Sequence, residues 1–231
     1  MGQFIDLRAA DGFQFPAYVA TPAGQPRGGV VVLQEIFGVN AHIRAVADGY
    51  AMAGYLAVAP ATFHRVKPGV ELGYAPDDMS AGSALKATVE AMGMNPAGPG
   101  VLPDIQAAID HAARAGKVGV VGYCWGGLLT WRSACLLKGV SAAVPYYGGG
   151  ITTEAEIART PKCPVLAHFG EKDHWISLEG VAAFRQAHPE VELHIYPANH
   201  GFNCDHRGAY DAAAAALARE RTLAFFARQL G

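Results

Sequence analysis

Short apolar runs rich in valine alternate along the chain with longer amphipathic segments. Five of these runs are continuous in apolar character, which is typical of strands that are buried on both faces of a parallel sheet. A sixth run alternates more between apolar and polar residues, so we expect it nearer a sheet edge. The expected strands are residues 28–34, 55–60, 117–122, 142–147 and 164–169, with 191–196 nearer the edge.

The segments between these runs carry helical periodicity, at residues 42–53, 80–92, 102–115, 126–138, 178–187 and 210–229. Regular alternation of strand and helix predicts an α/β fold, with a mostly parallel central sheet and helices on both faces. Residues 4–19 have period-2 stretches around Asp11-Gly12 and predict a leading antiparallel hairpin.

One domain spanning residues 1–231 accounts for the pattern, since no linker or internal repeat interrupts it. Residues 61–100 are irregular and contain several prolines and glycines around one helical stretch. Long loops of this kind are often lids or walls of binding sites, although a plain surface excursion explains the region about as well.

Composition narrows the class of protein. The chain is 51% hydrophobic and 16% charged, with a formal net charge of −2, which argues against a disordered chain and a nucleic-acid-binding protein. We find no pattern of a signal peptide and no apolar run long enough for a membrane span. The four cysteines form no CxxC pair and are expected to be free thiols, so we expect a cytoplasmic protein.

The hexapeptide Gly122-Tyr123-Cys124-Trp125-Gly126-Gly127 follows an expected strand and opens an expected helix. Its form is G-x-nucleophile-x-G, the sharp strand-to-helix turn on which α/β hydrolases carry their nucleophile. Glycine is needed around this turn for steric reasons, and the helix N-terminus favours a thiolate and an oxyanion. We therefore expect Cys124 to be a nucleophile; the alternative is a small buried hydrophobic residue.

A histidine and an acid follow in the chain order that α/β hydrolases use. Asp173 comes after one expected strand, and His200 after the next. Both would lie at the carboxyl edge of the sheet, where the active sites of α/β folds form. Glu171 is an alternative acid, whereas His174 shares a loop with Asp173 and cannot easily reach the sulfur.

Two further groups of residues are notable, a carboxylate in an apolar setting and a candidate metal-binding cluster. Glu35 stands where an apolar strand meets an apolar turn, a position in which a carboxylate needs a partner. Cys204, His206 and His200 can be drawn as a metal cluster, but their spacing matches no common zinc pattern. We expect no metal and no cofactor.

Four motifs together resemble the dienelactone hydrolase family, a cysteine branch of the α/β hydrolases. They are QEIFGVN at 34–40, GYCWGG at 122–127, GEKDHW at 170–175 and NHGF at 199–202, in family order. The resemblance implies an α/β-hydrolase fold and the triad Cys124, His200 and Asp173. It also implies that Glu35 pairs with the resting thiol and accepts its proton.

The same resemblance implies an oxyanion hole made by the backbone amides of Ile36 and Trp125. The implied reaction is hydrolysis of a small ester or lactone through a thioacyl-enzyme. Apart from the resemblance, we expect a monomer or small homo-oligomer that has no membrane or nucleic-acid partner. The sequence departs from the family at the substrate carboxylate: residues 78–86 contain no arginine, and Gly201 replaces a serine. Arg65, Lys67 and Arg207 are the candidate replacements, although solvated surface charge is the favoured interpretation of all three.

Aromatic residues near strand ends are candidate pocket residues. Phe37 and Tyr146 are preferred over Tyr123, Trp125 and Tyr147, and Arg207 is a further candidate for binding substrate, although core packing explains the aromatics nearly as well.

Other functions would use the same activated Cys124. The protein could be a thiol sensor of oxidants or electrophiles, or an acyltransferase or thioesterase. A catalytically silent binding module is the remaining alternative.

Overall fold

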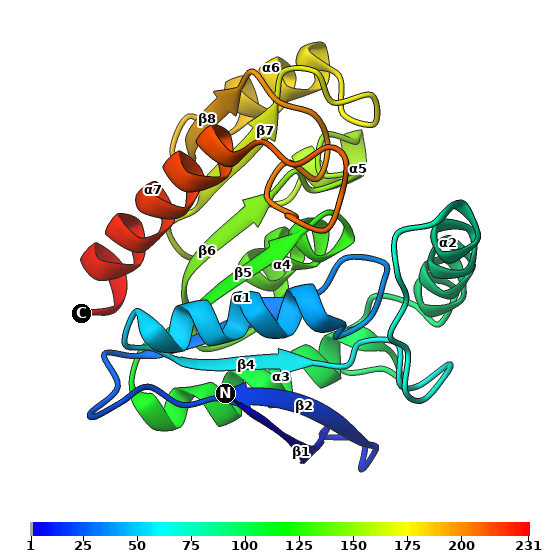
Figure 1. Ribbon diagram of the computed structural model, residues 1–231, viewed down its shortest axis with the longest axis vertical. Coiled ribbons are helices and arrows are strands. Elements are labelled where there is room, and N and C mark those ends of the chain that lie inside the picture. Colours follow the sequence, from blue (N-terminus) through cyan, green and yellow to red (C-terminus); the bar gives the residue numbers. More distant parts are fainter. Residues whose placement is uncertain (1) are drawn as a thin grey trace.

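An eight-stranded sheet runs through the centre of the protein, in the order β1-β2-β4-β3-β5-β6-β7-β8 (Figure 1). The computed structural model describes residues 2–231. β1 and β2 form an antiparallel hairpin and β2 pairs antiparallel with β4, whereas every later pairing is parallel. The strands are β1 Gln3–Arg8, β2 Gln14–Ala20, β3 Gly29–Leu33, β4 Leu56–Pro60, β5 Val118–Tyr123, β6 Val140–Tyr146, β7 Leu166–Gly170 and β8 Glu192–Tyr196.

Burial along the strands explains their sequences. Every residue of β3 and β5 is buried, because both faces of these central strands are covered. β8 lies at the sheet edge and exposes Glu192 and Ile195, as its alternating pattern predicted. The leading hairpin and the mostly parallel sheet are likewise confirmed.

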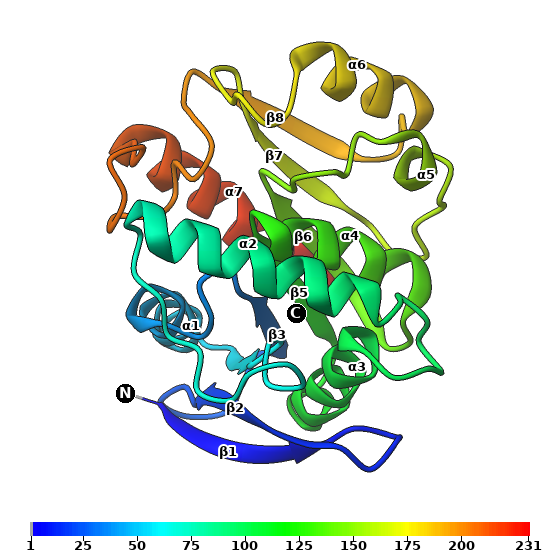
Figure 2. The ribbon, with the colours of Figure 1, turned by 90° about the vertical axis from the view of Figure 1, so that its right-hand side faces the viewer.

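Helices cover both faces of the sheet (Figure 2). α1 and α7 pack on one face, against β2–β4 and β5–β7 respectively, and α3 and α4 pack on the other. The helices are α1 Ala41–Met52, α2 Pro76–Ala91, α3 Val101–Ala112, α4 Trp125–Leu136, α5 Glu154–Ile157, α6 Leu178–Ala187 and α7 Ala212–Leu230, with a 3₁₀ turn at Ala113–Ala115. No helix within residues 2–231 has the length and apolar character to cross a membrane.

Helix α5 is the one element that the sequence pattern did not predict. It has only four residues, too few to show a helical period. Tertiary contacts hold it: the Glu156 carboxylate is buried between Arg132 and Arg159, and the Glu156 carbonyl accepts a hydrogen bond from Trp131.

Helix α2 crosses the carboxyl ends of the central strands (Figure 2). It lies within the irregular region 61–100 and buries only Gly82 and Val89. A Cβ atom at Gly82 would overlap the carbonyl oxygen of Ile36, so glycine allows the helix to approach this loop. α2 therefore forms a wall over the edge of the sheet where active sites of α/β folds lie.

Candidate active site

Cys124 occupies the sharp turn between β5 and α4. Its φ of 55° lies in the left-handed region, which a non-glycine residue rarely adopts without a functional reason. A Cβ at Gly122 would overlap the Gly126 carbonyl, and one at Gly126 would overlap the Leu33 carbonyl, which explains both glycines of the motif. Cys124 is partly exposed, and the other three cysteines are also free thiols, as expected.

His200 and Asp173 form a buried pair. The Nδ1 atom of His200 lies 2.8 Å from Oδ2 of Asp173, whose side chain is fully buried. The other carboxylate oxygen accepts hydrogen bonds from the backbone amides of Trp175 and Ile176. Asp173 is thus held rigidly, and it orients the imidazole so that Nε2 is free for chemistry.

The competing acid and histidine lie elsewhere. Glu171 and His174 are both exposed, whereas Asp173 between them is buried. The structure therefore pairs Asp173, rather than Glu171, with His200.

Electrostatics favours the protonated form of His200. Burial by itself would lower the pKa of this imidazole, but the charge of Cys124 and the hydrogen bonds to Asp173 and Cys124 outweigh it. The net effect raises the pKa of His200 to about 10. An imidazolium beside Cys124 is the arrangement that stabilises a thiolate.

Glu35 is buried and paired, as the sequence required, but its partner is not the thiol. Its Oε1 atom lies 3.0 Å from Nη1 of Arg207, and Tyr74 donates a long hydrogen bond of 3.5 Å to Oε2. Within residues 2–231, Glu35 makes no hydrogen bond with Cys124. Gly201 makes room for this pair, because a Cβ there would lie 2.6 Å from the Arg207 guanidinium.

Two backbone amides beside Cys124 are free to donate. Neither the Ile36 amide nor the Trp125 amide gives a hydrogen bond to any group in residues 2–231. Trp125 is the first residue of α4, where amides have no partner within the helix. Free amides at this place can stabilise a developing oxyanion.

A cavity of about 410 Å³ opens over Cys124. Phe37 and Arg207 line it, as expected from the sequence. The sequence did not single out Met79, Ser83, Lys86 and Trp175, although the first three belong to region 61–100. The full lining is Ile36, Phe37, Met79, Ser83, Lys86, Cys124, Trp125, Gly149, Gly150, Trp175, His200 and Arg207.

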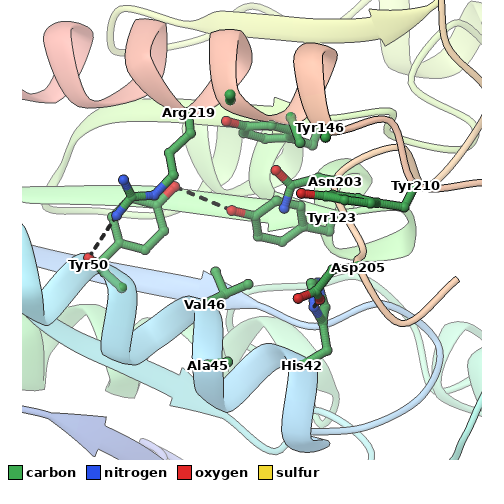
Figure 3. Close-up of a pocket in the computed structure, with 14 residues that line it drawn as sticks. His42, Ala45, Val46, Tyr50, Tyr123, Tyr146, Asn203, Asp205, Tyr210 and Arg219 are labelled. Atoms are coloured by element: carbon green, nitrogen blue, oxygen red, sulfur yellow. Dashed lines mark hydrogen bonds and ion pairs between the residues drawn. The ribbon is translucent and has the colours of Figure 1, made fainter.

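Tyr146 does not line this cavity, which corrects the expectation that it contacts substrate. Its side chain is on the sheet face covered by α1 and α7, where its hydroxyl lies 2.6 Å from that of Thr222. Figure 3 shows Tyr146 and Tyr123 together in a separate pocket. Tyr146 pairs in register with Tyr123, one residue before Cys124, and successive strand residues face opposite sides.

The three candidate cations have different surroundings. Arg65 is bound by Asp104 and Asp11, and Lys67 is exposed outside the cavity. Arg207 lines the cavity but is paired with Glu35. Lys86 also reaches the cavity, where Glu90 lies 2.8 Å from its Nζ atom.

A mostly parallel sheet, a strained turn after β5 and a histidine–aspartate pair at its carboxyl edge define an α/β hydrolase. The sequence profile of the Dienelactone hydrolase family matches residues 15–230. A protein of Pseudomonas putida named carboxymethylenebutenolidase is 38% identical, over 96% of this chain and 95% of its own. The chain therefore belongs to the dienelactone hydrolase family, and it is a hydrolase of ester or lactone bonds.

Solved structures agree with this membership. A Klebsiella pneumoniae protein, provisionally described as a dienelactone hydrolase, superposes with a TM-score of 0.79 at 32% identity, covering 98% of this chain and 99% of that one. A dienelactone hydrolase-like phosphotriesterase from metagenomic libraries has the same TM-score of 0.79 at 22% identity, covering 100% of this chain and 99% of that one. The second likeness concerns the fold alone.

Proposed function

We propose that the protein hydrolyses small esters or lactones through a thioacyl-enzyme formed on Cys124. The observation that carries this proposal is the strained turn, which presents Cys124 to a cavity that His200 also lines. Asp173 orients His200 through its Nδ1 atom. A binding module without chemistry would have no need of this combination.

In the first half-reaction, the Cys124 thiolate attacks the carbonyl carbon of the substrate. The carbonyl oxygen takes up negative charge and accepts hydrogen bonds from the amides of Ile36 and Trp125. Collapse of the tetrahedral intermediate breaks the carbon–oxygen bond, and the His200 imidazolium gives its proton to the departing oxygen. In a lactone this oxygen stays attached to the acyl group.

In the second half-reaction, water replaces the sulfur. His200 takes a proton from water as the water oxygen attacks the thioester carbonyl. The sulfur leaves as a thiolate, and the site returns to its starting state. A thiolate also leaves readily from the tetrahedral intermediate of the first half-reaction, where it competes with the leaving group of the substrate. Esters, which have the better leaving group, therefore suit this site better than amides.

Glu35 is proposed to accept the Cys124 proton when the thiol is activated, as the family resemblance implies. In the structure Glu35 is paired with Arg207, so the proposed step requires the carboxylate to exchange the guanidinium for the thiol. Glu35 then passes this proton to His200, which supplies the imidazolium of the first half-reaction, and pairs again with Arg207.

The cavity favours a small substrate with an apolar body and a negative group. Phe37, Met79 and Trp175 supply apolar surface, and Lys86 and Arg207 bring cationic groups to the cavity, each of which would bind a substrate anion beside its own carboxylate partner. Lys86 lies on α2, in the stretch that has no arginine. We propose that residues 61–100 act as the wall that holds the substrate, through α2.

The test is acylation by p-nitrophenyl acetate. A rapid burst of p-nitrophenol, an acetyl mass on the Cys124 peptide and continued turnover support the proposal. Acetylation of another residue, or full turnover by the Cys124→Ala variant, contradicts it. A stable adduct on Cys124 without turnover points instead to a transferase or a thiol sensor.

A cytoplasmic location and a monomeric or small homo-oligomeric state stay predictions.

A further inference from the structure

A thiol, an imidazole and a carboxylate meet beneath the active site, although the sequence spreads them over three segments. One donor atom each from Glu35, His42 and Cys204 lies within 4.8 Å of the other two. All three residues are buried, at 1%, 3% and 0% exposure. We propose that these residues form a binding site for Zn²⁺ or a similar soft divalent cation.

The arrangement around His42 resembles that of a metal ligand. Its Nδ1 atom lies 3.1 Å from Oδ1 of Asp205, so the carboxylate fixes the orientation of the ring. Its Nε2 atom is buried and has no hydrogen-bond partner within residues 2–231. Histidines that bind metals commonly use one nitrogen for the ion and the other for a carboxylate.

Glu35 has an oxygen available for a cation. Arg207 occupies Oε1, whereas Oε2 has only the long contact with the Tyr74 hydroxyl. A metal on Oε2 therefore leaves the Arg207 pair intact. The guanidinium also offsets the negative charge that a carboxylate and a thiolate bring to one place.

The donor set selects the class of metal. Sulfur and nitrogen ligands with one carboxylate suit Zn²⁺ or Co²⁺, whereas Mg²⁺ and Ca²⁺ prefer oxygen ligands alone. Binding replaces the Cys204 S–H bond by an S–metal bond and releases one proton to solvent. The metal keeps its charge throughout, so no oxidant or reductant is needed.

A path leads from the surface to His42. The side chain of Asp205 is 63% exposed, and a cavity of about 270 Å³ lined by His42, Asn203, Asp205 and Tyr210 opens beside it (Figure 3). His206 lies close by, with its ring centroid 5.7 Å from that of His42.

Metal binding is expected to slow the enzyme. A metal-bound Glu35 cannot accept a proton from Cys124, so occupancy should reduce acylation. This consequence rests on the proposed function, whereas the metal site itself does not.

The experiment is a Co²⁺ titration of chelator-treated protein, followed by competition with Zn²⁺. The expected result is one equivalent bound with a thiolate-to-cobalt charge-transfer band, which Zn²⁺ removes. Removing a residue that only supports a metal ligand weakens metal binding by about 10–100-fold. Cys204→Ser and His42→Gln remove proposed ligands themselves, so each should weaken Co²⁺ binding at least as much. Circular dichroism checks that both variants fold, and Cys204→Ala serves if Cys204→Ser does not.

Three control variants leave the proposed metal ligands unchanged. Cys163→Ser removes a thiol elsewhere, Cys124→Ser removes the nucleophile, and His206→Ala removes the neighbouring surface histidine. All three should retain the charge-transfer band. Loss of the band in Cys124→Ser or His206→Ala, or its persistence in both Cys204 variants, overturns the proposed site. Because Cys124→Ser cannot form the thioacyl-enzyme, its titration tests the site independently of the proposed function. Zn²⁺ binding without any slowing of wild-type acylation overturns the inhibitory role alone.

Discussion

Arg207 lies 3.0 Å from the Glu35 carboxylate, although the two residues are 172 positions apart in the sequence. Glu35 follows β3, and Arg207 lies in the loop between β8 and α7. The side chains are 1% and 14% exposed, so most of the pair is shielded from water. The ion pair therefore links the two loops that flank Cys124.

Replacing Arg207 by methionine should destabilise the protein. The variant leaves a buried carboxylate without its charge partner, which costs about 3–5 kcal/mol in comparable sites. Urea unfolding of Arg207→Met measures the loss. Arg219→Met is the control, because Arg219 has no carboxylate partner within residues 2–231 and donates to the Gly49 carbonyl. The double variant Arg207→Met/Glu35→Gln should recover part of the stability. Equal stability of wild type and Arg207→Met would show that the pair contributes nothing.

Removing the proposed nucleophile, Cys124, should abolish turnover. Loss of one member of a catalytic triad lowers kcat by about 10⁴–10⁶-fold in a well-studied protease, and we expect a similar fall for Cys124→Ala. The measurement is kcat for a p-nitrophenyl ester, with Cys163→Ala as the matched thiol control. Residual activity above a tenth of the wild-type rate would identify a different nucleophile.

The pH profile of acylation should extend far into the alkaline range. The pKa of His200 is raised to about 10, so the imidazolium persists above its ordinary range and is lost as the pH rises through about 10. The burst rate constant should therefore fall only near pH 10. Asp173→Asn removes one cause of the raised pKa and should move this alkaline limb to lower pH. An unshifted limb in Asp173→Asn would mean that Asp173 does not set the protonation of His200.

Crowding the contact between α2 and the loop after β3 should impair catalysis more than stability. A methyl group at Gly82 overlaps the Ile36 carbonyl and displaces either the helix or the Ile36 amide that we propose for the oxyanion hole. Misplacement by about 1 Å can cost about 100-fold in rate, so we expect Gly82→Ala to lower kcat by 10–100-fold. Ala87→Leu adds bulk at an exposed position of the same helix and should leave kcat unchanged. A drop in melting temperature with unchanged kcat would contradict this explanation.

Local sequence patterns were enough to predict the sheet and the candidate triad. Valine-rich runs recur regularly along the chain, and Cys124, Asp173 and His200 each lie within four residues of the end of a strand, β5, β7 and β8 respectively. Strand ends place such residues at one edge whatever the loops do.

Features that depend on distant contacts were not predictable in the same way. The Glu35–Arg207 pair joins two loops without periodicity, and α5 is held by contacts of Glu156 rather than by its own pattern. Tyr146 was misplaced because proximity to a strand end does not tell which face of the sheet a side chain occupies. Lys86 was missed because nothing in an irregular region shows which helix face meets the cavity.

Under the mechanism proposed above, a thiolate on Cys124 also sets the order of the two half-reactions. Its charge is the largest contribution that raises the pKa of His200, while burial lowers it. In the proposed mechanism, acylation turns the thiolate into a neutral thioester, which removes the main contribution that raises the pKa of His200, and the imidazolium gives its proton to the leaving group. A neutral imidazole then faces the acyl group, ready to accept a proton from water. In this proposed sequence His200 becomes a neutral base only after acylation, so it cannot activate water before the thioester has formed.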